Sequence, residues 1–142
     1  MARILLVEDS PAMRSYVRTA LETPPDLGDP VELVEAASGF DALRLLPRSS
    51  YDLVITDINM PDINGLEVIR FVRGSAHHRE VAVLIISTQS SERDRSRGLA
   101  LGADAFLAKP FTPEALRLAV SRSLSMRPSR RGGPQPASGS GV

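Results

Sequence analysis

Short runs of apolar residues alternate with amphipathic segments along most of the chain. Apolar runs of about four to six residues, bounded by polar residues, are typical of strands buried on both faces of a parallel sheet. Residues 31–36 alternate apolar and acidic positions, which indicates a less buried edge strand, whereas the more continuous run 81–86 indicates a central strand. The runs expected to form strands are residues 4–7, 31–36, 53–55, 81–86 and 105–108.

Between these runs, apolar residues recur at the spacing of an α-helix. Ser10 and Pro11 supply an N-cap and a first-turn proline for the first helix, and Ser38 can cap the second, which Pro47 ends. The fourth helical segment is polar on all sides in its first half and is weakened by Gly98, so we expect that half to be loosely held. The expected helices cover residues 11–22, 38–46, 66–72, 91–102 and 112–124.

The regular alternation of strand and helix predicts an α/β fold, a doubly wound (βα)5 arrangement of five parallel strands with helices on both faces. Residues 23–30 contain three prolines and a glycine and are expected to form a loop. From Arg127 onward Pro, Gly, Ser and Arg dominate, a composition that forms no core. We therefore expect one folded domain, residues 1–125, and a disordered tail, residues 126–142.

Composition narrows the class of protein. The chain has no Cys, which excludes disulfides, thiolate metal sites and thiol catalysis. No apolar run approaches about 18 residues and no charged-then-apolar leader opens the chain, so we expect a cytoplasmic protein without membrane insertion. Residues 1–124 carry 14 basic and 17 acidic side chains, and this mildly acidic body argues against nucleic acid as a partner. Of the 17 basic residues 16 are Arg, and the single Lys is Lys109.

Charged residues follow three of the expected strands. Glu8 and Asp9 follow the first, Asp57 the third and Lys109 the last. Because ligands of open α/β sheets bind at the carboxyl ends of the strands, we expect these side chains to share one site. A solvated acidic rim would explain each residue alone but not their joint occurrence on several strands.

Three clustered carboxylates repel one another, so either one stays protonated or a cation joins them. A ligand set made only of oxygen suits Mg²⁺, which keeps positions free for phosphate oxygens. A carboxylate beside Mg²⁺ can attack phosphorus and form an aspartyl phosphate. Lys109 would supply a cation for this transfer, and Ser87 or Thr88 would supply a hydroxyl.

These residues, in this order and spacing, resemble the receiver domain of bacterial two-component response regulators. The resemblance covers about residues 2–125. Because no output domain is expected, the chain is similar to single-domain chemotaxis regulators of the CheY type. The motifs that carry it are Glu8-Asp9-Ser10, Asp57 with Asn59-Met60-Pro61 and Gly65, Ser87-Thr88, Gly102-Ala103-Asp104-Ala105 and Lys109-Pro110-Phe111.

The resemblance implies a flavodoxin-like sheet of strand order 2-1-3-4-5 and a site with defined roles. Asp57 would accept a phosphoryl group from a sensor histidine kinase, and the protein would catalyse only its own phosphorylation and dephosphorylation. Mg²⁺ would be bound by Asp9, Asp57 and the backbone carbonyl of Asn59, with Glu8 acting mainly through a water. Lys109 would pair with the phosphoryl group, and its bond to Pro110 would be cis.

The resemblance also implies a switch. Ser87, which lies 22 residues before Lys109, would bond a phosphoryl oxygen, and Phe106 would rotate into the space that it leaves. Asn59, Thr88 and Gln89 would tune the lifetime of the phosphoryl group. A downstream target protein would bind the face formed by the fourth helix, the fifth strand and the fifth helix.

Some features leave other functions open. Glu8 replaces the commoner Asp, and residues 91–98 lack the usual apolar positions. The unusual fourth helix favours a pseudo-receiver that binds a partner without phosphorylation, whereas the presence of the acidic pair, Asp57 and Lys109 counts against it. A Mg²⁺-dependent phosphatase of the haloacid-dehalogenase type is disfavoured because Asn59 stands where a second Asp would act as acid and base. His77 and His78 are interpreted as part of a solvated loop, since adjacent side chains diverge and make a poor metal site.

Overall fold

The structure is a computed structural model that describes residues 2–22, 31–88 and 92–126. Five parallel strands form one sheet in the order β2-β1-β3-β4-β5. This confirms the predicted flavodoxin-like α/β fold and its strand order. The strands are β1 (Ala2–Val7), β2 (Val31–Ala36), β3 (Leu53–Thr56), β4 (Ala82–Ser87) and β5 (Ala105–Ala108). The helices are α1 (Pro11–Glu22), α2 (Gly39–Leu45), the 3-10 helix η1 (Leu46–Arg48), α3 (Gly65–Gly74), α4 (Glu92–Leu101) and α5 (Pro113–Met126).

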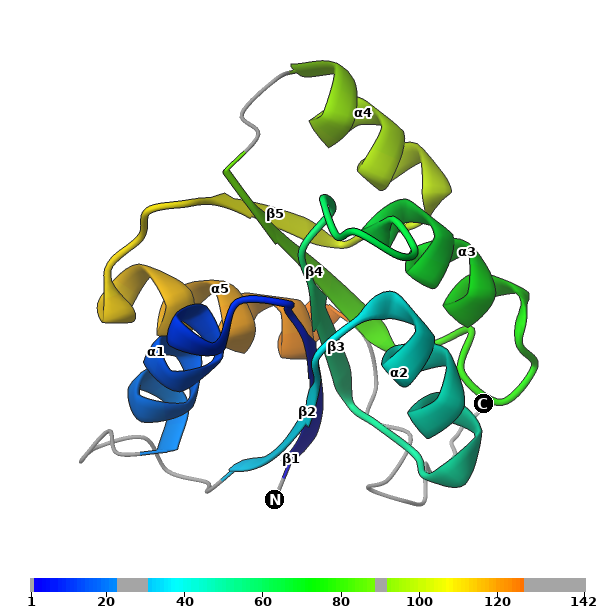
Figure 1. The fold of residues 1–142 in the computed structure, drawn as a ribbon, viewed down its shortest axis with the longest axis horizontal. Coiled ribbons are helices and arrows are strands. Elements are labelled where there is room, and N and C mark those ends of the chain that lie inside the picture. Colours follow the sequence, from blue (N-terminus) through cyan, green and yellow to red (C-terminus); the bar gives the residue numbers. More distant parts are fainter. Residues whose placement is uncertain (1, 23–30, 89–91, 127–142) are drawn as a thin grey trace.

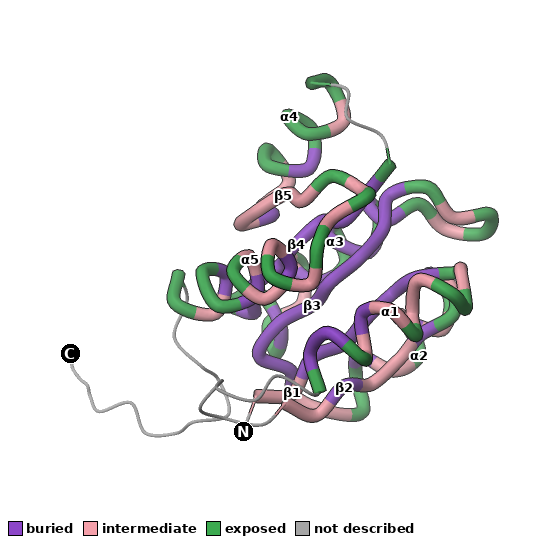
Figure 2. The backbone as a smooth tube through the Cα atoms, turned by 90° about the vertical axis from the view of Figure 1, so that its left-hand side faces the viewer, coloured by how far each residue is buried: buried purple, intermediate pink, exposed green. Residues whose placement is uncertain are grey.

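Helices cover both faces of the sheet (Figure 1): α1 and α5 lie on one side, and α2, α3 and α4 on the other. Alternate residues of each strand therefore enter two separate cores. In β1, Ile4 and Leu6 pack toward α1 and α5, whereas Leu5 and Val7 pack toward α2 and α3. The whole of β3 and β4 is buried and the edge strand β2 is partly exposed, as the hydrophobic pattern indicated, and the other edge strand, β5, is also partly exposed (Figure 2).

Element boundaries agree with the sequence-based predictions to within about two residues. Ser38 caps α2 by accepting a hydrogen bond from the Asp41 backbone N–H at 3.1 Å, as expected, and Pro47 lies in η1 directly after that helix. Met126, which we assigned to the tail, is instead the last residue of α5. The rest of the predicted tail, the 23–30 loop and the first residue of the predicted 91–102 helix lie outside the described residues. No helix in the described part of the chain is long and apolar enough to cross a bilayer.

The prediction of a solvated loop is wrong for His78. Its side chain is buried, and its Nε2 donates a hydrogen bond to the Leu46 carbonyl oxygen at 2.6 Å. Helices leave their last carbonyl groups without intrahelical partners, and His78 satisfies one of these at the end of α2. His77 remains exposed, with its Nε2 3.2 Å from the Ser50 hydroxyl. The histidine pair therefore joins the α3–β4 loop to the segment before β3, at the amino-terminal ends of the strands. The acidic residues lie at the opposite, carboxyl-terminal ends.

Two glycines allow helices to approach the sheet closely. A Cβ on Gly65 would collide with the backbone carbonyl oxygen of Asp57, and one on Gly98 would collide with the Cδ1 of Ile85. Gly98 is the one buried residue of α4. The sequence pattern suggested only that this glycine weakens the helix, whereas in the structure it is the contact through which α4 packs on β4.

We predict that Gly65→Ala lowers the free energy of unfolding by about 1–3 kcal/mol, the usual result of overpacking. Gly98→Ala should have a smaller effect, because Ile85 can move the end of its side chain and Ala favours the helix by about 1 kcal/mol. Gly74→Ala is the matched control, since nothing lies within 4 Å of a Cβ there. Urea denaturation followed by circular dichroism measures all three. Equal stability of the Gly65 and Gly74 variants would contradict the close packing at Asp57.

Candidate functional site

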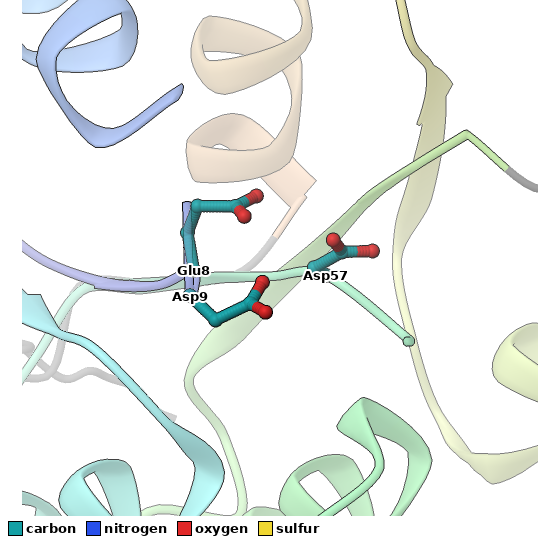
Figure 3. Close-up of side chains that lie close together, drawn as sticks. All are labelled: Glu8, Asp9 and Asp57. Atoms are coloured by element: carbon teal, nitrogen blue, oxygen red, sulfur yellow. The ribbon is translucent and has the colours of Figure 1, made fainter. Parts of the chain in front are cut away.

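The acidic residues and the lysine meet at the carboxyl ends of the strands. Glu8 and Asp9 follow β1, Asp57 follows the adjacent β3, and Lys109 follows β5. Backbone hydrogen bonds continue the sheet into the site, since Asp57 donates to the Val7 carbonyl at 3.1 Å and Lys109 to the Ser87 carbonyl at 2.9 Å. Figure 3 shows Glu8 and Asp9 extending from the end of β1 toward Asp57. The expected shared site is present.

Lys109 pairs with two of the three carboxylates. Its Nζ lies 2.8 Å from Glu8 Oε1 and 3.0 Å from Asp57 Oδ2. The side chains of all three residues expose 9% or less of their surface. Asp9 adds a third carboxylate, so the acidic groups outnumber the one ammonium and their negative charge is only partly compensated. A divalent cation would balance this charge.

Burial and pairing shift the pKa values of two of these groups. Burial raises the pKa of Glu8, and the hydrogen bonds from Lys109 and from the Ser10 backbone N–H counteract this only in part. Burial acts to lower the pKa of Lys109, but its hydrogen bonds to Glu8 and Asp57 outweigh that effect and raise it. Lys109 therefore stays a cation at neutral pH, directly beside Asp57.

The three carboxylates fit a hard divalent cation. Each offers a ligand oxygen, and these oxygens lie within 4.8 Å of one another. Oxygen ligands of this kind suit Mg²⁺. Glu8 is already committed, because its Oε1 accepts from Lys109 and its Oε2 from the Ser10 N–H at 3.0 Å. Asp9 is exposed, and no residue in the described ranges hydrogen-bonds to its carboxylate. Of the three, Asp9 is therefore the carboxylate most open to a direct bond with a cation.

The hydrogen bonds of Asp57 fix the direction of its carboxylate. Oδ1 accepts from the Ile58 backbone N–H at 2.7 Å and, more weakly, from the Asn59 N–H at 3.4 Å, while Oδ2 accepts from Lys109. Asp57 as a whole exposes only 7% of its surface. Asp57 is therefore a carboxylate held in one orientation by donors on both of its oxygens.

The structure describes four of the five predicted switch and lifetime residues. Ser87 is fully buried at the end of β4, whereas Thr88 and Asn59 are exposed. Phe106 on β5 is partly buried and packs against the core beneath α2 and α3. Gln89 lies outside the described residues. The Lys109–Pro110 peptide bond is cis, as the family resemblance implied.

Sequence patterns did not single out two residues that support the site, Arg14 and Asp62. The carboxylate of Asp62, in the loop after Asp57, accepts hydrogen bonds from the backbone N–H groups of Gly39 at 3.2 Å and Phe40 at 2.9 Å. It thereby caps α2 from outside the helix. Arg14 on α1 donates to the Glu8 carbonyl oxygen at 2.8 Å. No spacing signal in the sequence marks either contact.

Comparisons with known proteins agree with this geometry. The family model of the response regulator receiver domain matches residues 4–121. The response regulator MprA of Mycobacterium sp. (strain KMS) is 39% identical over 132 residues, which cover 93% of this chain and 54% of MprA. The chain spans about half the length of the first curated relatives that it matches.

Solved structures show the same fold. The chemotaxis protein CheY4 of Vibrio cholerae is 34% identical, with a TM-score of 0.78 over 87% of this chain and 98% of that one. The receiver domain of a sensor histidine kinase from Pseudomonas aeruginosa is 28% identical, with a TM-score of 0.76 over 87% of this chain and 98% of that one. That domain has a magnesium ion coordinated in its active site cleft.

We predict that the carboxyl group of Asp62 titrates with a pKa of about 2, below its usual 3.8, chiefly because the Phe40 N–H donates to its ionised form. A carboxyl group whose pKa is lower in the folded than in the unfolded protein stabilises the fold at pH values above its unfolded pKa. The stability that Asp62 contributes is therefore present above about pH 4 and lost as the pH falls through about 2. Carboxyl ¹³C NMR titration of the native and urea-unfolded protein measures both values. A native midpoint near the unfolded one would contradict the cap.

Proposed function

The chain belongs to the family of response regulator receiver domains, and from this we propose that Asp57 accepts a phosphoryl group from a sensor histidine kinase. Residues 1–125 would form the receiver domain, acting in the cytoplasm with proteins as partners rather than nucleic acid or membrane. The observation that carries the proposal is the ammonium of Lys109, 3.0 Å from a buried and oriented Asp57 carboxylate beside an acidic pair.

In the proposed transfer, an oxygen of the Asp57 carboxylate attacks phosphorus of the kinase phosphohistidine. The new oxygen–phosphorus bond forms as the phosphorus–nitrogen bond breaks, and its electron pair stays on the imidazole nitrogen. The Ile58 N–H holds the carboxylate in place, and Lys109 compensates negative charge on the transferred group. Beyond this the protein would catalyse only its own dephosphorylation.

Mg²⁺ would be held by Asp9, Asp57 and the Asn59 backbone carbonyl, with Glu8 acting through water. When bound, it would neutralise charge on the phosphoryl oxygens during transfer. The oxygen-only ligand set of this chain and the magnesium ion in the similar P. aeruginosa receiver domain support this assignment.

Phosphorylation would then shift the protein between two states. Added charge and acceptor oxygens on Asp57 would attract the hydroxyl of Ser87, and Phe106 would move into the vacated space. The surface formed by α4, β5 and α5 would change its affinity for a downstream target. These elements follow one another on one side of the molecule (Figure 2), and Leu99 and Leu118 are exposed on its helices.

The first experiment is intact mass spectrometry after incubation with Mg²⁺ and acetyl phosphate. We expect one added phosphoryl group, absent in Asp57→Asn and absent without Mg²⁺. Beryllofluoride, which mimics the acyl phosphate, covers the case of a short lifetime. If acetyl phosphate adds no mass and beryllofluoride does not bind, although the protein is folded and binds Mg²⁺, the phosphorylation proposal is wrong. A phosphorylation-independent binding module is then favoured.

A second experiment tests the switch. Beryllofluoride should shift the amide NMR signals of β5 and α5 in the unaltered protein, and Ser87→Ala should reduce these shifts while Asp57 still binds the reagent. Thr88→Ala is the matched control, because Thr88 is the next residue but is exposed. Equal shifts in the Ser87 and Thr88 variants would assign the switch to another group.

A further inference from the structure

Every polar group of Glu8, in the main chain and in the side chain, has a hydrogen-bond partner. Its N–H donates to the Ala36 carbonyl on β2 at 3.0 Å, and its side-chain oxygens accept from Lys109 and the Ser10 N–H. Its carbonyl oxygen lies beyond the last residue of β1 and accepts from Arg14 Nη1 at 2.8 Å. Arg14 thus satisfies the carbonyl of the residue that directly follows β1.

Arg14 is itself fixed by an edge-strand carboxylate. Its Nε donates to Glu35 Oε1 at 3.0 Å, and the other oxygen of Glu35 accepts from Arg18 Nε at 2.6 Å. The side chains of Arg14 and Glu35 expose only 19% and 28% of their surface between α1 and β2. Because a guanidinium is a planar fork, one side chain can bridge the Glu35 carboxylate and the Glu8 carbonyl in a single geometry.

The peptide held in this way carries Asp9. No described residue hydrogen-bonds to the Asp9 carboxylate, so no such contact anchors the end of this side chain, and its place depends on the backbone that carries it and on its own rotamer. The carbonyl bonded by Arg14 belongs to the Glu8–Asp9 peptide unit. A rotation of that unit would turn Asp9 away from Asp57, with which it shares the candidate metal site.

We propose that Arg14, anchored by Glu35, is a positioning residue for the metal site: it holds the Glu8–Asp9 peptide so that the Asp9 carboxylate faces Asp57. Arg14 touches neither metal nor phosphoryl group and acts only through this peptide. The inference rests on the proposed Mg²⁺-dependent function and adds to it a support outside the residues of the family motifs.

Arg18 provides a matched control on the same helix. It bonds the same Glu35 and also the Leu33 carbonyl at 3.2 Å, but it makes no contact with Glu8. Removing Arg18 therefore deletes a similar set of contacts between α1 and β2. It leaves the Glu8–Asp9 peptide held by Arg14.

The experiment is an NMR titration of the full chain with Mg²⁺ alone, following the amide signals of Asp57 and Asn59. Loss of a residue that supports metal ligands typically weakens binding by 10- to 100-fold, and we expect Arg14→Ala to weaken it by about tenfold. Arg18→Ala should bind like the unaltered protein. Arg14→Lys should fall between them, because an ammonium cannot bridge both partners in the fork geometry.

A metal-free measurement separates positioning from general damage. Amide hydrogen exchange without Mg²⁺ should become faster at Asp9 and Ser10 in Arg14→Ala but not in Arg18→Ala, with unchanged protection in β3 and β4. If Arg14→Ala does not fold, Arg14→Lys and Glu35→Gln are compared with Arg18→Ala in the same assays.

The outcomes are distinct. If Arg14→Ala binds Mg²⁺ as tightly as Arg18→Ala, the positioning role is overturned and the proposed function is untouched. If the unaltered protein itself does not bind Mg²⁺, the metal-dependent function fails, and this inference fails with it. Equal weakening in both variants would assign the effect to α1–β2 packing and would also overturn the proposal.

Discussion

The ion pair of Lys109 with Glu8 and Asp57 is the interaction on which the site depends. It joins the ends of β1, β3 and β5, and its side chains are almost inaccessible to solvent. Removing one partner from a buried pair destabilises proteins by about 3–5 kcal/mol, because the remaining charge is left uncompensated. The carboxylate proposed as nucleophile therefore also takes part in the ion pair that holds the strand ends together.

The loops around this ion pair are supported by three different physical devices. Because Gly65 has no side chain, α3 can begin in close contact with the Asp57 carbonyl. Asp62 uses a carboxylate to join the same loop to the start of α2. Arg14 uses a guanidinium to hold the peptide after β1. The strands fix the backbone only as far as their last residues. The loop contacts position the residues that follow.

Continuous apolar runs located β3 and β4 because burial on both faces leaves a pattern that does not depend on the partners of a strand, whereas alternating apolar and acidic positions located β2. The predicted strands placed the three carboxylates and Lys109 at one edge, whereas strand order and individual roles came with the family resemblance. The contacts that were not predicted are side-chain contacts between segments distant in the sequence. The burial of His78, the cap by Asp62 and the bridge from Arg14 to Glu35 join residues 32, 22 and 21 positions apart. Periodicity describes which face of an element is buried and carries no information about such meetings.

The glycine contact between α4 and β4 has a consequence for how such a protein can diversify. Apart from Gly98, every residue of this helix is at least partly exposed, including Arg93, Arg95 and Arg97. Substitutions on the outer surface of α4 therefore disturb neither the hydrophobic core nor the acidic centre. Under the proposed function, the target specificity of α4 can therefore change in evolution while the residues at the strand ends are inherited unchanged.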